Sequence, residues 1–386
     1  MDFDVLIVGA GLAGGSLACA LAGSNLSVGV LEHRAPRRPE GWDARVYAIS
    51  PANVAFLERL RIWPHLDHER IARVERMAVF GDAGGQLDFS AWDCGLDALA
   101  WIAESGPLTV ELWETLRRQP NIRVICPARP QALAIDADAA RITLDDGREL
   151  RAKLVVAADG ADSWVRNAAG LAVKTTAYEE LGVVANFETE LPHRSTAFQW
   201  FRGDGILAWL PLPGNRISIV WSTPKTHAKD LLELAPEAFA ATVRDAGKGA
   251  LGELTTITPA AGFPLRLMQV PQTVAPRLAL IGDAAHAIHP LSGHGINLGF
   301  QDAAVLADVL KEAPAWRDCG ELGLLRRYAR ARAEEVRLMQ GTTHMLNRLF
   351  RPQNPLIAGL RNTGLSLTSR LPVVKSAMVR YAAGLI

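Results

Sequence analysis

The sequence predicts an α/β protein with two sheets of different kinds and a helical C-terminal region. Three observations support this fold class. A buried-strand pattern at Asp4–Gly9 leads directly into a glycine-rich turn and a helix. Between Gly182 and Ser222, short apolar strands alternate with turns, which is typical of an antiparallel sheet. Helices are expected from Leu324 to the end of the chain, interrupted only at prolines.

The N-terminal stretch carries the pattern of a dinucleotide-binding site. The first strand is followed at once by GxGxxG, then by a small-residue helix over 15–22, a strand over 26–31 and an acid. Gly9 permits the turn, Gly11 lets the backbone approach a pyrophosphate, and Gly14 lets the helix press on the sheet. The final acidic side chain would accept hydrogen bonds from ribose hydroxyls. An ADP-containing cofactor is therefore expected here, held by Gly9, Gly11, Leu12, Ala13, Gly14 and Glu32.

A second cofactor element is expected at 278–310. A short apolar strand (278–281) ends in a turn with Asp283, and Gly293-x-Gly295-x-Asn297 then feeds a helix. A carboxylate at a strand end can hold a ribityl or ribose hydroxyl, and the free N–H groups of a helix N-terminus can face an anion. Alone, the stretch fits an ordinary strand-to-helix connection equally well. Together with the dinucleotide pattern at Gly9, the stretch favours a cofactor site over an ordinary connection.

A third acid and glycine pair, Asp159-Gly160, closes the apolar strand at 154–158. On its own, Asp159 could simply cap the following helix. Its position at a strand end, as at Asp283, also allows a place in the cofactor site.

The remaining elements complete a discontinuous architecture. A helix at Pro51–Leu60, a hairpin at Val79–Phe89, a helix at Thr109–Arg118 and a helix at Leu231–Asp245 are expected. Strands are expected over 123–126, 130–136, 141–144, 149–156, 182–187, 196–201, 206–212 and 216–221, and the segment over 262–267 returns to the cofactor unit. The cofactor domain then comprises 1–75, 100–178 and 262–335, the inserted sheet domain 76–99 and 179–261, and the helical region 336–386.

Composition excludes several other classes of protein. Formal net charge is zero and there is no basic tract with interleaved aromatics, so nucleic acid is not an expected partner. The four cysteines lie far apart without a CxxC pair, and no metal-ligand spacing is present, so neither disulfides nor a metal are expected. The apolar segment after Asp4 lacks a basic start and is interrupted by glycines, which argues against a signal or membrane span.

The three motifs together resemble a known family. GxGxxG at 9–14, Asp159-Gly160 and GDAAHxxHPxxGxGxNLG at 282–299 occur in the order found in the group A flavoprotein monooxygenases, of which para-hydroxybenzoate hydroxylase is typical. Arg45–Ser50, Asp159–Arg166 and Ala208–Leu212 make the chain most similar to the ubiquinone-biosynthesis hydroxylases. The resemblance covers essentially the whole chain and implies a Rossmann-like FAD-binding domain with an inserted antiparallel substrate domain.

The resemblance also implies roles for individual residues. Glu32 and the first glycines would hold the ADP half of FAD, Asp283 the ribityl chain, and Asp159 and Gly160 would serve FAD and NADPH. A larger polar residue usually opens the helix where this chain has Glu104-Ser105, so that contact is open. The other cofactor positions implied are Arg45, Pro290, Gly293, Gly295, Ile296 and Asn297.

The implied reaction is hydroxylation of an aromatic ring. NADPH or NADH would reduce FAD, O₂ would form a C4a-hydroperoxyflavin, and the substrate would be a prenylated phenol intermediate of ubiquinone biosynthesis. No catalytic side chain is assigned with certainty. His289 and Pro290 lie beside the flavin position, and His286 and His289 fit a scaffold role better than acid–base chemistry. The strand residues Leu207, Trp209 and Leu210 are expected to form the pocket wall, or else a plain β-core.

Two interpretations of the C-terminal region are possible from its composition. From Val336 to Ile386 there are seven arginines and lysines and no Asp or Glu, with apolar residues between them. The region could lie on an anionic membrane surface or cap the FAD domain. A cytoplasmic protein is expected, free or peripheral on the inner membrane face, alone, as a homo-oligomer or in a quinone-biosynthesis complex. Two alternatives remain: hydroxylation of a soluble aromatic, and a non-catalytic FAD-binding accessory subunit.

Overall fold

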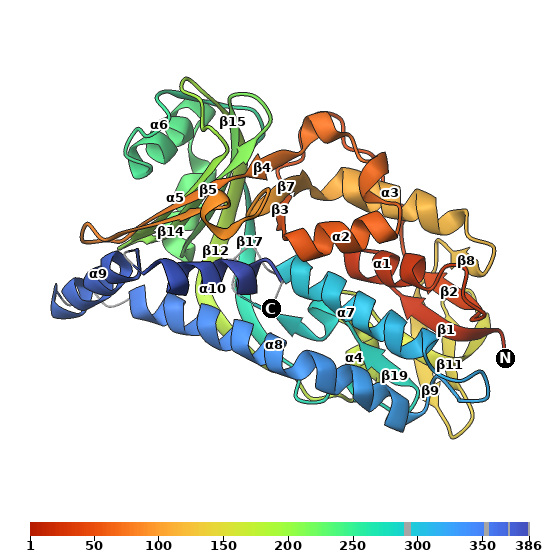
Figure 1. The fold of residues 1–386 in the computed structure, drawn as a ribbon. Helices are drawn as coiled ribbons and strands as arrows, with labels where there is room; N and C mark the ends of the chain where they lie inside the picture. The colour runs from red at the N-terminus through yellow and green to blue at the C-terminus, as the bar shows by residue number, and fades with distance from the viewer. Residues whose placement is uncertain (289–294, 351–354, 370, 385–386) are drawn as a thin grey trace.

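The computed structural model describes residues 1–288, 295–350, 355–369 and 371–384. Its strands form sheets of eight, nine and three strands among these residues, with helices packed around and between them (Figure 1). Up to the middle of the chain the elements are β1 (Phe3–Val8), α1 (Leu12–Ala20), β2 (Val28–Leu31), β3 (Val46–Ile49), α2 (Pro51–Arg59), β4 (Ala72–Val74), β5 (Arg76–Phe80), β6 (Gln86–Ser90), β7 (Ala100–Glu104), α3 (Ser105–Arg117), β8 (Ile122–Ile125), β9 (Pro130–Ile135), β10 (Ala140–Leu144), β11 (Glu149–Ala157) and α4 (Trp164–Ala168). They continue with β12 (Lys174–Thr189), β13 (Thr196–Arg202), β14 (Gly205–Leu212), β15 (Arg216–Pro224), α5 (Lys225–Glu233), α6 (Pro236–Ala246), β16 (Leu254–Thr256), β17 (Ala261–Gln269), β18 (Val274–Ala275), β19 (Leu278–Leu280), β20 (His286–Ala287), α7 (Gly295–Lys311), α8 (Leu322–Phe350), α9 (Pro355–Ser369) and α10 (Pro372–Ala382).

The eight-stranded sheet has a parallel centre in the order β19-β11-β1-β2-β8. Apart from Asp4 near its start, β1 is apolar, as is usual for a strand of a parallel sheet that is covered on both faces. One face packs against α1, α3 and α7, and the other against β10 and α4. The predicted α/β fold with a Rossmann-like core is confirmed.

The turn between β1 and α1 requires glycine at two positions. Gly9 has φ +101°, a conformation that side-chain-bearing residues rarely adopt. A Cβ on Gly14 would lie 2.0 Å from the carbonyl oxygen of Gly9. Helix α1 can therefore pack directly on the strand that precedes it, and its first turn stays open to the space beyond the sheet.

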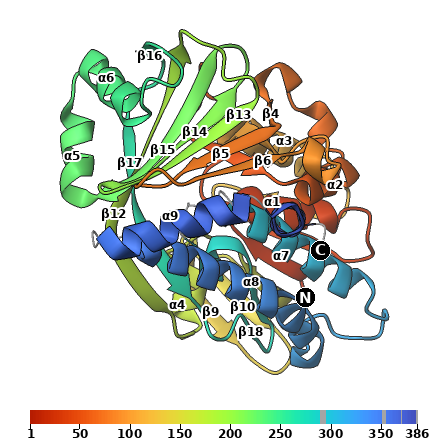
Figure 2. The same cartoon turned by 60° about the vertical axis from the view of Figure 1, so that its left-hand side comes forward.

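The nine-stranded sheet is mainly antiparallel, in the order β20-β17-β12-β15-β14-β13-β5-β6. The predicted hairpin at Val79–Phe89 is present as β5 and β6, and it joins the sheet through parallel pairing of β5 with β13. Helices α5 and α6 cover one face of this sheet, with a core that includes Trp209, Trp221 and Phe239 (Figure 2). The opposite face is turned toward the first domain.

Two sequence expectations differ from the structure. The single helix expected at Leu231–Asp245 is two helices, because Leu234 and Ala235 are extended and Pro236 starts α6 at a position where its missing N–H costs nothing. The antiparallel sheet also extends past the residue ranges expected for the inserted domain. β12 begins at Lys174 and β17 runs to Gln269, so strands cross the boundaries expected after 178 and 261.

The C-terminal region is helical, as predicted. α8 packs against the first domain, where the Tyr328 hydroxyl donates to the Leu280 carbonyl at 2.8 Å. α9 approaches the β5–β6 turn, where the Asn362 amide oxygen accepts from the N–H of Gly85 at 2.9 Å. In the part of the chain that the structure describes, none of these helices combines the length and apolarity needed to cross a membrane.

Candidate functional site

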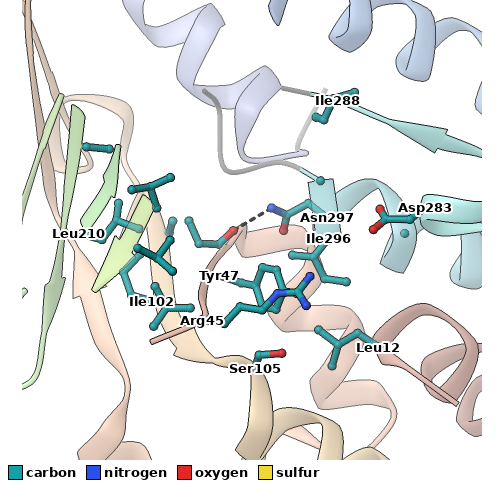
Figure 3. A pocket seen from close by; sticks show the side chains of 18 of the residues that line it. Leu12, Arg45, Tyr47, Ile102, Ser105, Leu210, Asp283, Ile288, Ile296 and Asn297 are labelled. Atoms are coloured by element: carbon teal, nitrogen blue, oxygen red, sulfur yellow. Dashed lines mark hydrogen bonds between the residues drawn. The ribbon is translucent and has the colours of Figure 1, made fainter. Parts of the chain in front are cut away.

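A cavity of about 1110 Å³ lies between the two large sheets. Figure 3 shows Leu12 and Asp283 at one end, Ile102 and Leu210 at the other, and Arg45 and Tyr47 between them. The walls come from segments far apart in the sequence, including the α1 turn, β3, β14, β15, β17, the start of α7 and the C-terminal helix α10. The fold therefore makes one chamber that both domains and the C-terminal region share.

The glycine-rich turn forms the floor of one end. Gly11, Leu12 and Ala13 line the cavity, and a Cβ on Gly11 would meet no protein atom within 4 Å. Gly9 and Gly14 do not line the cavity and act through the turn geometry. The Glu32 carboxylate accepts from the N–H of Ala10 at 2.7 Å and so braces this turn, without lining the cavity itself.

Asp283 stands at the same end, just after β19. Gly282 has φ +57°, which turns the chain so that the Asp283 side chain is exposed to the cavity. Burial in the surrounding protein raises the pKa of Asp283 above its usual value, although His286, Arg45 and Arg266 partly offset this. A carboxylate whose ionised form is disfavoured by the surrounding protein is stabilised when hydroxyl donors of a ligand hydrogen-bond to it.

Helix α7 points its N-terminus at the middle of the cavity. Gly295, Ile296 and Asn297 line it, and the helix begins at Gly295. The Asn297 amide holds the surrounding chain: it donates to the Ala48 carbonyl at 2.8 Å and accepts from the Ser50 N–H at 2.9 Å. The other positions expected in this loop, His289, Pro290 and Gly293, lie outside the described residues.

In the Asp159-Gly160 motif, Gly160 lines the cavity and Asp159 does not. Gly160 lines the cavity with φ +85°. Asp159 does not line it; its Oδ2 accepts from the N–H of Val165 at 3.0 Å, which is the helix-capping alternative considered from the sequence. Its Oδ1 is buried without a hydrogen-bond partner among the described residues. That oxygen is therefore unsatisfied among the described residues, but it does not open onto the cavity.

At the start of α3, Ser105 and not Glu104 faces the cavity. Glu104 is buried and forms two short contacts with Arg70, at 2.7 and 2.8 Å, so it supports the chain around Asp43 and does not reach the cavity. Ser105 lines the cavity, beside Tyr47. Arg45 lies over the Tyr47 ring at 5.4 Å and is exposed to the chamber.

The expected pocket wall is correct at only one of three positions. Leu207 and Trp209 are fully buried on the other face of the sheet, against α5 and α6, whereas Leu210 lines the cavity. Neighbouring residues of a strand point to opposite faces, so Trp209 and Leu210 cannot share a wall. The residues that face the cavity from β13, β14 and β15 are Ala197, Gln199, Ile206, Ala208, Leu210, Val220 and Ser222.

Gln199 and Ser222 were not singled out from the sequence. Both are largely buried and both line the cavity, where the rest of this sheet face is apolar. Neither side chain has a hydrogen-bond partner in the described part of the chain. The only available signal was strand alternation, since Gln199 and Ser222 occupy the phase opposite to Trp200 and Trp221.

His286 belongs to a scaffold, as considered likeliest from the sequence. Its Nε2 lies 2.7 Å from Asp302, whose other oxygen accepts from Arg332 at 2.7 Å. All three side chains are buried and none lines the cavity. Burial alone would raise the pKa of Asp302, but His286 and Arg332 outweigh it and hold that pKa below its usual value. The Asp302 carboxylate also accepts from the Gly282 N–H, which fixes the turn that presents Asp283.

These groups fit a flavin dinucleotide. The open space above Gly11 suits a pyrophosphate, the accessible Asp283 carboxylate suits a hydroxylated chain, and the α7 N-terminus suits a polar ring edge. Pockets for drug-sized molecules usually measure about 300–1,000 Å³. The chamber is larger than that, so it can hold a cofactor ring and a second, apolar molecule beside it.

Comparisons with known proteins agree with this arrangement. Residues 2–340 match the family described as FAD binding domain. The chain is 36% identical to ubiquinone hydroxylase UbiL of Rhodospirillum rubrum, over 99% of this chain and 89% of that protein. It is 33% identical to 3-demethoxyubiquinol 3-hydroxylase of Escherichia coli, over 99% and 98% of the two chains. Among solved structures, p-nitrophenol 4-monooxygenase PnpA of Pseudomonas putida has the same fold, with a TM-score of 0.80 at 20% identity over 99% and 98% of the chains.

Proposed function

The chain belongs to the FAD-binding-domain family, within the group of ubiquinone-biosynthesis hydroxylases, and we propose that it hydroxylates the ring of a prenylated phenol on the route to ubiquinone. It is an FAD-dependent monooxygenase. The single observation that supports the proposed substrate class is the continuous chamber, in which the cofactor groups at Gly11 and Asp283 share one space with an apolar sheet face.

The cofactor end is proposed to work through placement and charge. Bound FAD supplies the redox chemistry and the activation of O₂. Gly11 and the α1 turn would hold the pyrophosphate, and Asp283 would accept hydrogen bonds from the ribityl chain. The α7 N-terminus and Arg45 would supply positive charge to the flavin ring and so favour electron uptake by it.

The substrate end is proposed to orient a phenol and exclude water. Ile102, Leu210 and Val220 give the ring an apolar wall. Gln199 and Ser222 are the polar side chains of the sheet face that remain free to bind the phenol hydroxyl. Because a buried polar group without a partner is costly, this pair would favour a substrate whose hydroxyl satisfies it.

The C-terminal helix is proposed to border the path of the isoprenoid tail. Met378 of α10 lines the chamber together with Met77 and Phe89, and 46% of Met378 is exposed. Apolar side chains thus lead from the ring position to the outside of the protein. A long apolar tail attached to the ring could follow this route.

The same region is proposed to rest on an anionic membrane surface. From Val336 to Ile386 the sequence contains cations and no acids, and large apolar side chains are exposed on α8, α9 and α10. They are Leu338, Met345, Leu349, Leu367, Leu371 and Met378. Leu371 precedes the first residue of α10, and the other five lie within the helices. Such contact would place the tail path near the lipid in which prenylated substrates dissolve.

The test is a substrate comparison with the purified, FAD-loaded protein. NADPH and NADH are the proposed reductants, so their oxidation is followed with a short-chain prenylphenol and with the same phenol lacking the prenyl group. Oxidation stimulated mainly by the prenylphenol, with product one oxygen heavier, is expected. Equal or greater stimulation by the tail-free phenol would instead indicate a soluble aromatic substrate.

A further inference from the structure

A second cavity, of about 500 Å³, lies outside the chamber between α8 and the β12–β17 pair. Figure 1 shows α8 running along one edge of the molecule below these strands. From α8 the cavity is lined by Arg337, Gly341, His344 and Arg348, which recur at helical spacing and so face one way. Lys174 of β12 lines it as well.

The charged residues that line this second cavity are all basic. Lys174, Arg337 and Arg348 line the cavity, and no lining residue is acidic. In the described part of the chain these three cations form no ion pair, and no acid follows Val336 that could supply one. Other arginines of the same sheet have carboxylate partners, as Arg202 has Asp204 at 2.8 Å and Arg266 has Asp162 at 2.8 Å. Three uncompensated cations around one cavity repel each other, and an anion between them would relieve that repulsion.

The cavity also has a fixed polar wall. The Tyr178 hydroxyl lies 3.2 Å from Nδ1 of His344, and Gln340 donates to the Met268 carbonyl at 2.9 Å. Tyr178 is only 5% exposed, so this wall is part of the packed structure and not a mobile surface. Gly341 lies within the continuous helix α8 at the cavity, and a Cβ there would meet no atom within 4 Å. A glycine inside a helix costs about 1 kcal/mol relative to alanine, yet here no protein packing explains it.

We propose that this cavity binds a phosphate-bearing anion through Lys174, Arg337 and Arg348. Arginine forks and a lysine ammonium are the donors that recognise phosphate oxygens. At about 500 Å³ the cavity holds more than a bare phosphate, so the ligand carries a further group beyond its phosphate. The phosphate belongs either to a soluble metabolite or to a lipid head group.

The test measures binding, not activity, and so is independent of the proposed hydroxylation. Pyrophosphate is titrated calorimetrically against the FAD-loaded protein, and co-sedimentation is measured with phosphatidylglycerol and phosphatidylcholine vesicles. Lys174→Gln, Arg337→Gln and Arg348→Gln should each weaken binding in at least one arm by about tenfold. Arg123→Gln, which removes the same charge from an exposed position on β8, outside both the cavity and the C-terminal region, should not.

A further variant keeps all three charges. Gly341→Leu, favourable for a helix, places a side chain at the cavity and should also weaken binding. The arm that responds identifies the source: pyrophosphate indicates a soluble phosphate, and phosphatidylglycerol alone indicates a head group. If the cavity variants match Arg123→Gln in both arms while their flavin content and thermal midpoints stay normal, the site does not exist.

Discussion

The side-chain amide of Asn297 donates to the Ala48 carbonyl at 2.8 Å and thereby joins the start of α7 to the end of β3 (Figure 3). The same side chain accepts from the Ser50 N–H. Asn297→Ala would leave buried backbone groups on both sides without their partner. We expect a loss of about 2–4 kcal/mol in unfolding free energy, measured by urea denaturation. Exposed Asn167→Ala should stay within about 0.5 kcal/mol of the parent protein, and an equally small effect at Asn297 would contradict this joining role.

Asp283→Asn should separate cofactor affinity from stability. Because the pKa of Asp283 is raised by burial, its ionised form is disfavoured in the folded apoprotein, and apoprotein stability should fall as pH rises through that raised pKa. The amide in the variant carries no charge whose burial costs free energy. The unfolding free energy of the Asp283→Asn apoprotein should therefore exceed that of the parent apoprotein at neutral pH. It should nevertheless bind FAD about tenfold more weakly, by fluorescence titration. Exposed Asp138→Asn serves as the control; tighter FAD binding by Asp283→Asn would overturn the ribityl role.

Asp302→Asn tests the buried network beneath the Asp283 turn. The substitution leaves His286 and Arg332 without their carboxylate, and removing one partner of a buried ion pair costs about 3–5 kcal/mol. Because the pKa of Asp302 is lowered in the folded protein, its carboxylate contributes fully to the unfolding free energy above the ordinary aspartate pKa of about 3.9. That contribution is lost as the pH falls through the pKa of Asp302 in the folded protein. The stability gap between parent and variant should therefore narrow in acid. Asp308→Asn, exposed on the same helix, should show no such gap at any pH.

Ser222→Ala and Gln199→Leu test the orientation of the substrate. Each removes a hydrogen-bonding group from the chamber without touching the cofactor end. The prenylphenol KM should rise by about tenfold with FAD affinity unchanged. Ser218→Ala, four residues along the same strand and outside the chamber, should leave KM unchanged. An unchanged KM in both chamber variants would mean that the phenol binds elsewhere.

Local patterns predicted the geometry of the turn between β1 and α1, because that geometry follows from neighbouring residues. GxGxxG after an apolar strand specifies the turn at Gly9 and the close packing at Gly14 within a few residues. The single helix expected at Leu231–Asp245 is instead divided before Pro236, because a proline cannot continue a preceding helix.

The substrate half depends on contacts that no local pattern contains. Leu207 and Trp209 point away from the chamber because α5 and α6 cover that face of the sheet, and the alternation of the strand alone does not say which face is covered. Asp302 binds His286 and Arg332, which lie 16 and 30 residues away from it in the sequence. Met378 lines the chamber because the C-terminal helices return to it. Tertiary structure was needed to find each of them.

Isotopically labelled dioxygen tests the central claim most directly. The FAD-loaded protein is incubated with NADPH, a short-chain prenylphenol and labelled O₂, and the product is analysed by mass spectrometry. The account predicts a hydroxylated ring that carries one labelled oxygen atom. A hydroxylated product whose new oxygen comes from water, or reduced flavin that consumes O₂ without any hydroxylated product, would contradict it.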